Sequence, residues 1–104
     1  MTNYVIIYSG GTVPESEEGM QKVMADWGAW YGQMGDAVVD GGNPFGISKG
    51  ITADGVVDNV ISDPPASGYT IIAAESLDDA VAKCSNHPHI KHGGQLSVYE
   101  TFQM

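Results

Sequence analysis

The chain has 104 residues, 42% of them hydrophobic, with 13 acidic residues against four lysines and no arginine, a formal net charge of −9. This length predicts one domain, residues 1–104, and the hydrophobic content predicts a packed core. So few cations exclude nucleic acid as a partner, because such binding relies on cations that displace counterions from phosphates. An anionic membrane surface is disfavoured for the same reason.

The start of the chain has no pattern typical of secretion. Its first apolar run, residues 4–8, is too short for the hydrophobic region of a signal peptide, and no basic residue precedes it. No stretch approaches the roughly 20 apolar residues of a membrane span. We therefore expect a cytoplasmic protein. Cys84 is the only cysteine, so an intrachain disulfide is impossible, and we expect a buried small hydrophobe rather than a nucleophile.

Residues 4–8 also predict the first strand, because they are β-branched or aromatic and are followed by Ser-Gly-Gly. The run is apolar at every position rather than alternating, which predicts burial on both faces of a sheet. The helix that follows has an acidic first turn. Thr12, Val13 and Ser16 remain alternative residues for its N-terminal cap.

The longest periodic segment is residues 16–35, where apolar residues recur at helical spacing. They form one broad stripe: Met20, Val23, Met24, Trp27, Trp30, Tyr31 and Met34. This pattern predicts an amphipathic helix whose stripe lies on a sheet and whose end is marked by Gly35. Gly28 and Gly32 each disfavour a helix by about 1 kcal/mol relative to Ala. Their presence predicts that another backbone approaches closely.

Three further strand regions follow the helix. Residues 37–40 predict a short strand, which Gly41-Gly42 interrupts. Residues 47–61 predict a hairpin with Asp54-Gly55 at its turn, because this dipeptide suits the positive φ values of a type I′ turn. After a loop at 62–68 that contains two prolines, the apolar run 69–74 predicts a second central strand.

The last part of the chain predicts a short helix and a final strand. Ser76 is expected to cap a helix whose inward face is formed by Leu77, Ala80, Val81 and Cys84, at positions i, i+3, i+4 and i+7. Residues 86–94, which include all three histidines, predict a loop, and residues 96–102 predict the last strand.

The resulting order, βαββαβ, predicts a ferredoxin-like α+β sandwich with both helices on one side of an antiparallel sheet. Two helices cover only one face of that sheet, whereas residues 4–8 and 69–74 are apolar on both faces. The uncovered face therefore requires a partner, and a second copy of the chain is the simplest one. We expect a homodimer packed sheet to sheet, which makes a dimeric α+β barrel.

Five segments together resemble the YCII-related family, in the branch named for its DGPF tetrapeptide. They are WGAWYGQMG (27–35), VDGGNPFG (39–46), SGYTIIAAESLDDAVAKC (67–84), HPHI (87–90) and GGQLSVYET (93–101). Their order and spacing over most of the chain carry the resemblance. It implies a ferredoxin-like protomer that dimerises as an α+β barrel, and it implies a fold more strongly than an activity.

The chain departs from this family in two places. Its DGPF-type segment is degenerate, since residues 57–65 read VDNVISDPP. Some members have a proposed His–Asp pair with the His in the first helix, but the matching stretch here, residues 23–26, contains no His. The resemblance therefore does not transfer that pair.

The histidines His87, His89 and His92 fall within six residues of one another. An imidazole is suited to general acid–base catalysis, and His87 and His89 are the candidates for it. A metal site with an added carboxylate is a second interpretation, although the H-x-H-x-x-H spacing matches no strong zinc signature, and we assign no metal or cofactor. The third interpretation is a solvated loop with one histidine at a helix C-terminus.

Aromatic and polar residues elsewhere are candidates for ligand binding. Trp27, Trp30 and Tyr31 predict either the wall of an apolar pocket or core and dimer packing. Asp40 ends a strand directly before two glycines, where a ligand could meet backbone amides. The full set that we assign to ligand binding is Trp27, Trp30, Asp40, Asn43 and Tyr69.

Two functions remain open from the sequence. The first is a dimeric small-molecule-binding module with an apolar pocket between the first helix and the sheet. The second is a small-molecule enzyme of lyase or isomerase type, suggested by analogy with other dimeric barrels. In that enzyme His87 or His89 would be the base, and Asp40 or Tyr69 would orient the substrate.

Overall fold

The computed structural model describes residues 1–11, 14–58 and 65–103. Thr12 and Val13, two of the three alternative helix caps, lie outside the described residues. The end of the predicted hairpin and Pro64 of the loop after it, within residues 59–64, also lie outside them. Within the described part, no helix combines the length and apolar character that a membrane crossing requires.

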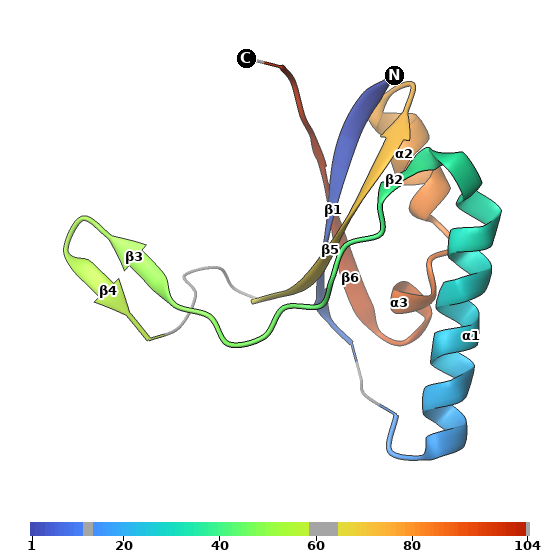
Figure 1. Ribbon diagram of the computed structural model, residues 1–104, viewed down its shortest axis with the longest axis horizontal. Coiled ribbons are helices and arrows are strands. Elements are labelled where there is room, and N and C mark those ends of the chain that lie inside the picture. The colour runs from blue at the N-terminus through green and yellow to red at the C-terminus, as the bar shows by residue number, and fades with distance from the viewer. Residues whose placement is uncertain (12–13, 59–64, 104) are drawn as a thin grey trace.

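A four-stranded antiparallel sheet forms the centre of the molecule (Figure 1). Its strands, in spatial order, are β2 (Val38–Asp40), β5 (Ala66–Ala74), β1 (Thr2–Gly10) and β6 (Gly94–Glu100). The helices α1 (Glu17–Met34), α2 (Leu77–Cys84) and α3 (Pro88–Lys91) lie on one side of it. This strand order and layering are those of a ferredoxin-like α+β sandwich, so the predicted fold class is confirmed.

Helix α1 begins after Ser16, whose Oγ accepts a hydrogen bond from the Gly19 amide at 3.0 Å, and it ends at Gly35, where φ is +54°. The predicted stripe is wrong in its first half, because Met20 and Met24 are exposed, Met24 to 70%. The first turns of α1 extend beyond the sheet, so only the later turns have a surface to cover (Figure 1).

The close approach of another backbone at the helix glycines is not found within the described part of this chain. A Cβ atom added at Gly28 or at Gly32 would meet nothing within 4 Å. Neither glycine is needed for the approach of another backbone within this chain, and both positions lie on the exposed side of α1.

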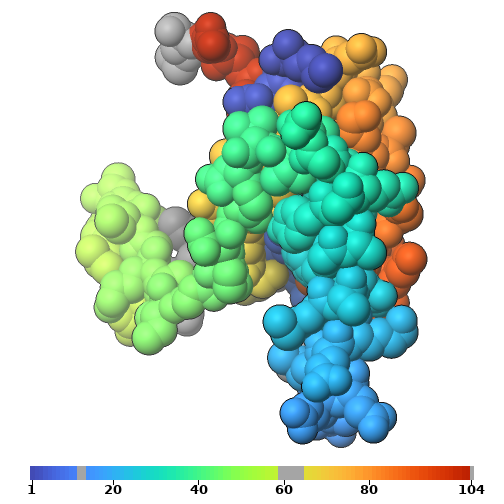
Figure 2. Space-filling view, turned by 45° about the vertical axis from the view of Figure 1, so that its right-hand side comes forward, coloured from blue at the N-terminus to red at the C-terminus, as the bar shows by residue number. Residues whose placement is uncertain are grey.

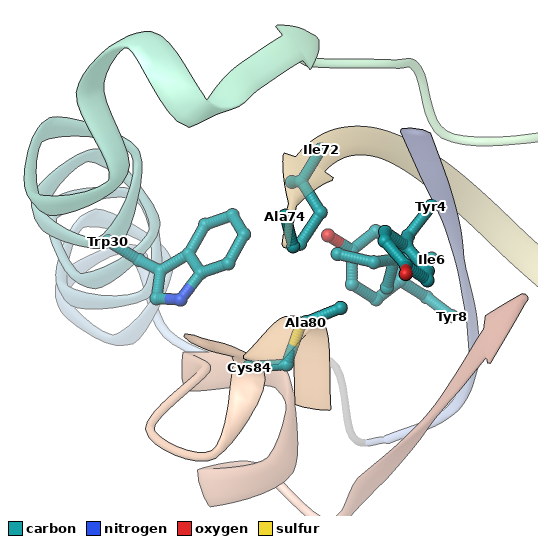
Figure 3. Packing of buried hydrophobic residues seen from close by; sticks show 8 residues of the cluster. All are labelled: Tyr4, Ile6, Tyr8, Trp30, Ile72, Ala74, Ala80 and Cys84. Atoms are coloured by element: carbon teal, nitrogen blue, oxygen red, sulfur yellow. The ribbon is translucent and has the colours of Figure 1, made fainter. Parts of the chain in front are cut away.

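The core lies between the sheet and the helices (Figure 3). Strand β1 contributes alternate residues to it, as its period of two requires. The buried set is Tyr4, Ile6, Tyr8, Trp30, Ile72, Ala74, Ala80 and Cys84. The residues between them in β1, Val5 and Ile7, are only half-buried, because none of the described helices lies on the other face of the sheet (Figure 1). In a single protomer, therefore, β1 is buried on one face only, and not on both faces as the sequence predicts.

Helix α2 has the expected cap, since Ser76 Oγ accepts a hydrogen bond from the Asp79 amide at 3.0 Å. Cys84 is buried as predicted, and burial raises the pKa of its thiol to about 11. The expected inward face is half wrong, because Leu77 and Val81 are exposed, Val81 to 50%. The helix packs on the sheet through Ala80 and Cys84 only, and Leu77 and Val81 lie at the side of this contact.

The predicted hairpin is present but short. It consists of β3 (Gly50–Thr52) and β4 (Gly55–Val57), which form a separate two-stranded sheet that projects away from the helices (Figures 1 and 2). The expected type I′ turn at Asp54-Gly55 is wrong. Thr52 pairs with Gly55, so Ala53 and Asp54 form the loop, and only Gly55 has a positive φ, +128°.

Candidate functional site

A cavity of about 320 Å³ lies where α1, the end of β1 and the start of β5 meet the segment after β2. That segment and α1 lie side by side on the face shown in Figure 2. The cavity is lined by Tyr8, Trp27, Tyr31, Gly41, Gly42, Asn43, Pro44, Ser67, Gly68, Tyr69 and His89. Most of this lining is aromatic or backbone, and none of the described residues in it is a lysine, aspartate or glutamate.

The turn after β2 forms one wall of the cavity. Asp40 Oδ1 accepts a hydrogen bond from the Gly42 amide at 2.9 Å, which holds the turn, and Gly42 has φ +77°. A Cβ atom on Gly42 would overlap the carbonyl oxygen of Tyr69. Only glycine therefore lets this turn lie against β5, and Asp40 shapes the wall without lining it.

Aromatic rings form the opposite wall. The Tyr8 and Trp27 rings meet edge to face with centroids 5.0 Å apart, and Trp27 and Tyr31 lie 6.2 Å apart. The Tyr8 and His89 rings also meet edge to face, at 5.4 Å. Such contacts hold the rings in fixed orientations, so the apolar wall is preformed.

His87 lies behind this wall, and its side chain is fully buried. Its Nδ1 accepts a hydrogen bond from the His89 backbone N–H at 3.0 Å, and its Nε2 lies 3.1 Å from Tyr8 Oη. A nitrogen that accepts from an amide carries no proton, so the proton of the neutral ring is on Nε2, which donates to Tyr8. Burial, with a smaller effect from His89, lowers the pKa of His87 to about 4.

The hydrogen bonds continue from Tyr8 into the sheet. Tyr8 donates to Thr70 Oγ1 at 2.8 Å, and Thr70 donates to the carbonyl of Gly41 at 3.0 Å. Burial raises the pKa of Tyr8 well above its usual value. Tyr8 is therefore a neutral donor, and a continuous chain of hydrogen bonds connects α3 to the turn after β2.

Each sequence-predicted histidine has a different environment. The prediction of a loop at 86–94 is wrong, because His87 caps α3 and is buried rather than solvated. His89 lines the cavity, and its Nε2 lies 2.8 Å from the carbonyl of Ser9. His92 lies away from the cavity lining, with its Nε2 3.8 Å from Asp26. Among the described residues no group of three or more His, Cys, Asp or Glu is placed to hold a metal ion.

The structure brings four of the predicted site residues to the cavity: Trp27, Asn43, Tyr69 and His89. It does not bring Trp30 there, because that side chain is buried in the core and its Nε1 donates to the carbonyl of Lys83 at 3.3 Å (Figure 3). Tyr8 and Ser67 are lining residues that the sequence did not predict. The alternation of residues 4, 6 and 8 in one strand is the signal that could have placed Tyr8 on the helix-covered face.

The fold and the cavity together define a ferredoxin-like α+β protein with a preformed, largely aromatic pocket. No protein-family model and no curated protein matches the sequence.

One solved structure is similar to this chain: 5-chloro-2-hydroxyhydroquinone dehydrochlorinase (TftG) from Burkholderia phenoliruptrix AC1100, in complex with 2,5-dihydroxybenzoquinone. The TM-score is 0.57 and the sequence identity is 19%, over 97% of this chain and 95% of that one. A likeness at this identity shows the fold, which agrees with the fold that the resemblance to YCII-related proteins implies.

Proposed function

We propose that this protein is a homodimeric, small-molecule-binding α+β barrel of the YCII-related type, and that its cavity takes a compound with one planar ring. The observation that carries the proposal is the aromatic wall around about 320 Å³ of space. That volume is near the lower end for ligand sites, which suits a single ring with small substituents. The similar dehydrochlorinase was solved with a one-ring quinone, which supports the same class of ligand.

Trp27 is the residue whose loss best tests the binding proposal. Phenol is expected to bind saturably, and Trp27→Leu is expected to weaken it about tenfold, because the largest ring of the wall is removed. Isothermal titration calorimetry or ligand-observed NMR would measure both affinities. The control is Met24→Leu, an exposed position of the same helix, with an unchanged affinity. Absence of saturable binding by the unaltered protein, or an equal loss in both variants, would contradict the proposal.

A second function, a lyase- or isomerase-type enzyme, is favoured by the position of His89. Its ring lines the cavity, and donation from Nε2 to the carbonyl of Ser9 leaves Nδ1 as the nitrogen that can take a proton from a ligand. His87 would act only through Tyr8, since both of its ring nitrogens are already hydrogen-bonded. Chemical conversion of a ring compound during the binding titration would favour this function over binding alone.

The proposal of a homodimer is based on the sheet face that lies opposite the helices. Val5 pairs with Ile71 and Asn3 with Ala73, so the apolar side chains of these pairs lie on that face, and they are only half-buried. Tyr99, which pairs with Val5 from the other side, is 58% exposed. Exposed apolar side chains gathered on one sheet face are typical of an interface, and a second copy of the same face would bury them symmetrically.

Ile71→Lys is expected to shift the protein from dimer to monomer, because a lysine at the centre of the interface would be buried without a partner. Sedimentation velocity at micromolar concentration measures the change. Met24→Lys adds the same charge on α1, away from the proposed interface, and is expected to remain dimeric. A monomeric unaltered protein, or a dimeric Ile71→Lys variant, would refute the homodimer.

A further inference from the structure

We propose that the cavity selects ligands that donate hydrogen bonds, which for a one-ring compound means hydroxyl substituents rather than ethers, carbonyls or carboxylates. The inference rests on the proposed binding function and deepens it, since it names the chemistry of the substituents. It follows from the direction of the hydrogen bonds around the cavity, because four of the side chains that line it, those of Tyr8, Tyr31, Ser67 and His89, donate their own hydrogens into the protein.

The direction begins at His87. Its Nδ1 accepts from the His89 amide, so its Nε2–H donates to Tyr8 Oη. Tyr8 then has one hydrogen left to place, and it donates that hydrogen to Thr70 Oγ1 at 2.8 Å. Thr70 in turn donates to the carbonyl of Gly41. A carbonyl accepts only, so the chain of donors ends in the backbone and cannot reverse.

Tyr31 shares the end of this chain. Its hydroxyl donates to the carbonyl of Gly41 at 3.0 Å and lies 3.1 Å from Thr70 Oγ1. With the hydrogens of Tyr8 and Thr70 already placed, the hydrogen of Tyr31 also points at the protein. What Tyr31 offers to a ligand is therefore a lone pair on Oη.

Two more lining residues behave in the same way. Ser67 Oγ donates to the carbonyl of Tyr8 at 3.2 Å, and His89 Nε2, 2.8 Å from the carbonyl of Ser9, must carry a proton and donate it. Ser67 is left with oxygen lone pairs, and a neutral His89 is left with the Nδ1 lone pair. Thus Tyr31, Ser67 and His89 each donate a hydrogen bond to a backbone carbonyl, and each has a lone pair left that can accept a hydrogen bond from a ligand.

The charge of the protein also disfavours a carboxylate ligand. No lysine lines the cavity, and the whole chain has a formal net charge of −9, so a carboxylate ligand would find neither a cation nor a favourable field. Trp27 and Asn43 retain donor groups, so the selection is expected to be about tenfold rather than absolute. A neutral ring with hydroxyl groups is the ligand class that matches these acceptors.

Three probes of related shape test the inference: resorcinol, m-xylene and 1,3-dimethoxybenzene. Resorcinol donates hydrogen bonds, 1,3-dimethoxybenzene only accepts them, and m-xylene does neither. Resorcinol and m-xylene are similar in size. Tyr31→Phe removes one acceptor without changing the ring, so it is expected to weaken resorcinol about five- to tenfold and to leave the other two within about twofold. The control is Met24→Leu, an exposed position of the same helix outside the cavity lining, with unchanged affinity for all three.

Equal effects of Tyr31→Phe on resorcinol and on 1,3-dimethoxybenzene, or no effect on resorcinol, would overturn the inference and leave the binding proposal intact. Failure of all three probes to bind would instead overturn the proposed function itself, and the inference with it. A direct measurement is independent of the variants: long-range ¹H–¹⁵N NMR of the histidine rings is expected to show the proton of His87 on Nε2. A proton on Nδ1 would refute the first step.

Discussion

Replacement of Gly42 by Ala is expected to lower the free energy of unfolding by about 3 kcal/mol or more, because two effects add. The residue has φ +77°, a region that side chains with a Cβ rarely adopt, and its Cβ would overlap the carbonyl oxygen of Tyr69. The Tyr69 carbonyl is part of the backbone of β5, so it cannot move aside as the end of a flexible side chain can. The turn must therefore move away from β5, and we expect phenol binding to be lost with it. Chemical denaturation and calorimetry measure the two losses.

The matched control is Gly28→Ala. This glycine lies in α1, and its added Cβ would meet nothing within 4 Å. Removal of a glycine from a helix interior is expected to stabilise the protein by about 0.5–1 kcal/mol and to leave binding unchanged. The same substitution, glycine to alanine, is thus expected to lower the free energy of unfolding at position 42 and to raise it at position 28. A Gly42→Ala variant as stable as the unaltered protein would show that the turn is not held against β5.

Acidification is expected to remove up to about 3 kcal/mol of stability between pH 6.5 and pH 4 through His87 alone. Burial lowers the pKa of this histidine to about 4 in the folded protein, from an ordinary value of 6.5. The unfolded chain therefore binds a proton throughout that interval and the folded protein does not. The contribution of neutral His87 to the free energy of unfolding is therefore fully present above pH 6.5 and is lost as the pH falls toward 4. Urea unfolding at a series of pH values measures the slope.

His87→Gln supplies the control, since the amide does not titrate in this range and can still donate to Tyr8. Its stability is expected to be lower overall, but with a flatter dependence on pH. Asp79 does not confuse the result, because its pKa is lowered, chiefly by the hydrogen bond from the Glu75 amide, and it gains its proton below this interval. An equal slope in both proteins would mean that His87 is not the titrating group.

The main elements could be predicted from sequence because their signals are local. Hydrophobic runs located β1 and β5, and helical spacing located α1 and α2, with Ser76 as the expected cap of α2 and Ser16 as one of three candidates for the cap of α1. What failed depended on distant contacts. Met24 has the spacing of a buried residue, but its side chain is 70% exposed. Periodicity assigns a face to a residue without showing whether a neighbouring layer reaches it.

The lining of the candidate site was predictable in part for the same reason. Trp27, Asn43, Tyr69 and His89 were assigned from their local context and do line the cavity. Tyr8 and Ser67 meet only because β1 and β5 pair in a particular antiparallel register, which places Tyr8 opposite Gly68. The burial of His87 could not be predicted either. It depends on a four-residue helix, too short for a periodic signal, placed beneath the rings of α1.

The projecting β3–β4 hairpin has a consequence for the cooperativity of folding. Two strands without a third strand or a covering helix are marginally stable on their own, so the hairpin is expected to open without the four-stranded sheet unfolding. Among the described residues, each of these two strands also has one unpaired edge, and the side chains of Ile51 and Val56 are exposed. In an isolated protomer, therefore, the part of the chain most prone to edge-to-edge aggregation lies outside the cooperative unit, and global stability does not protect it.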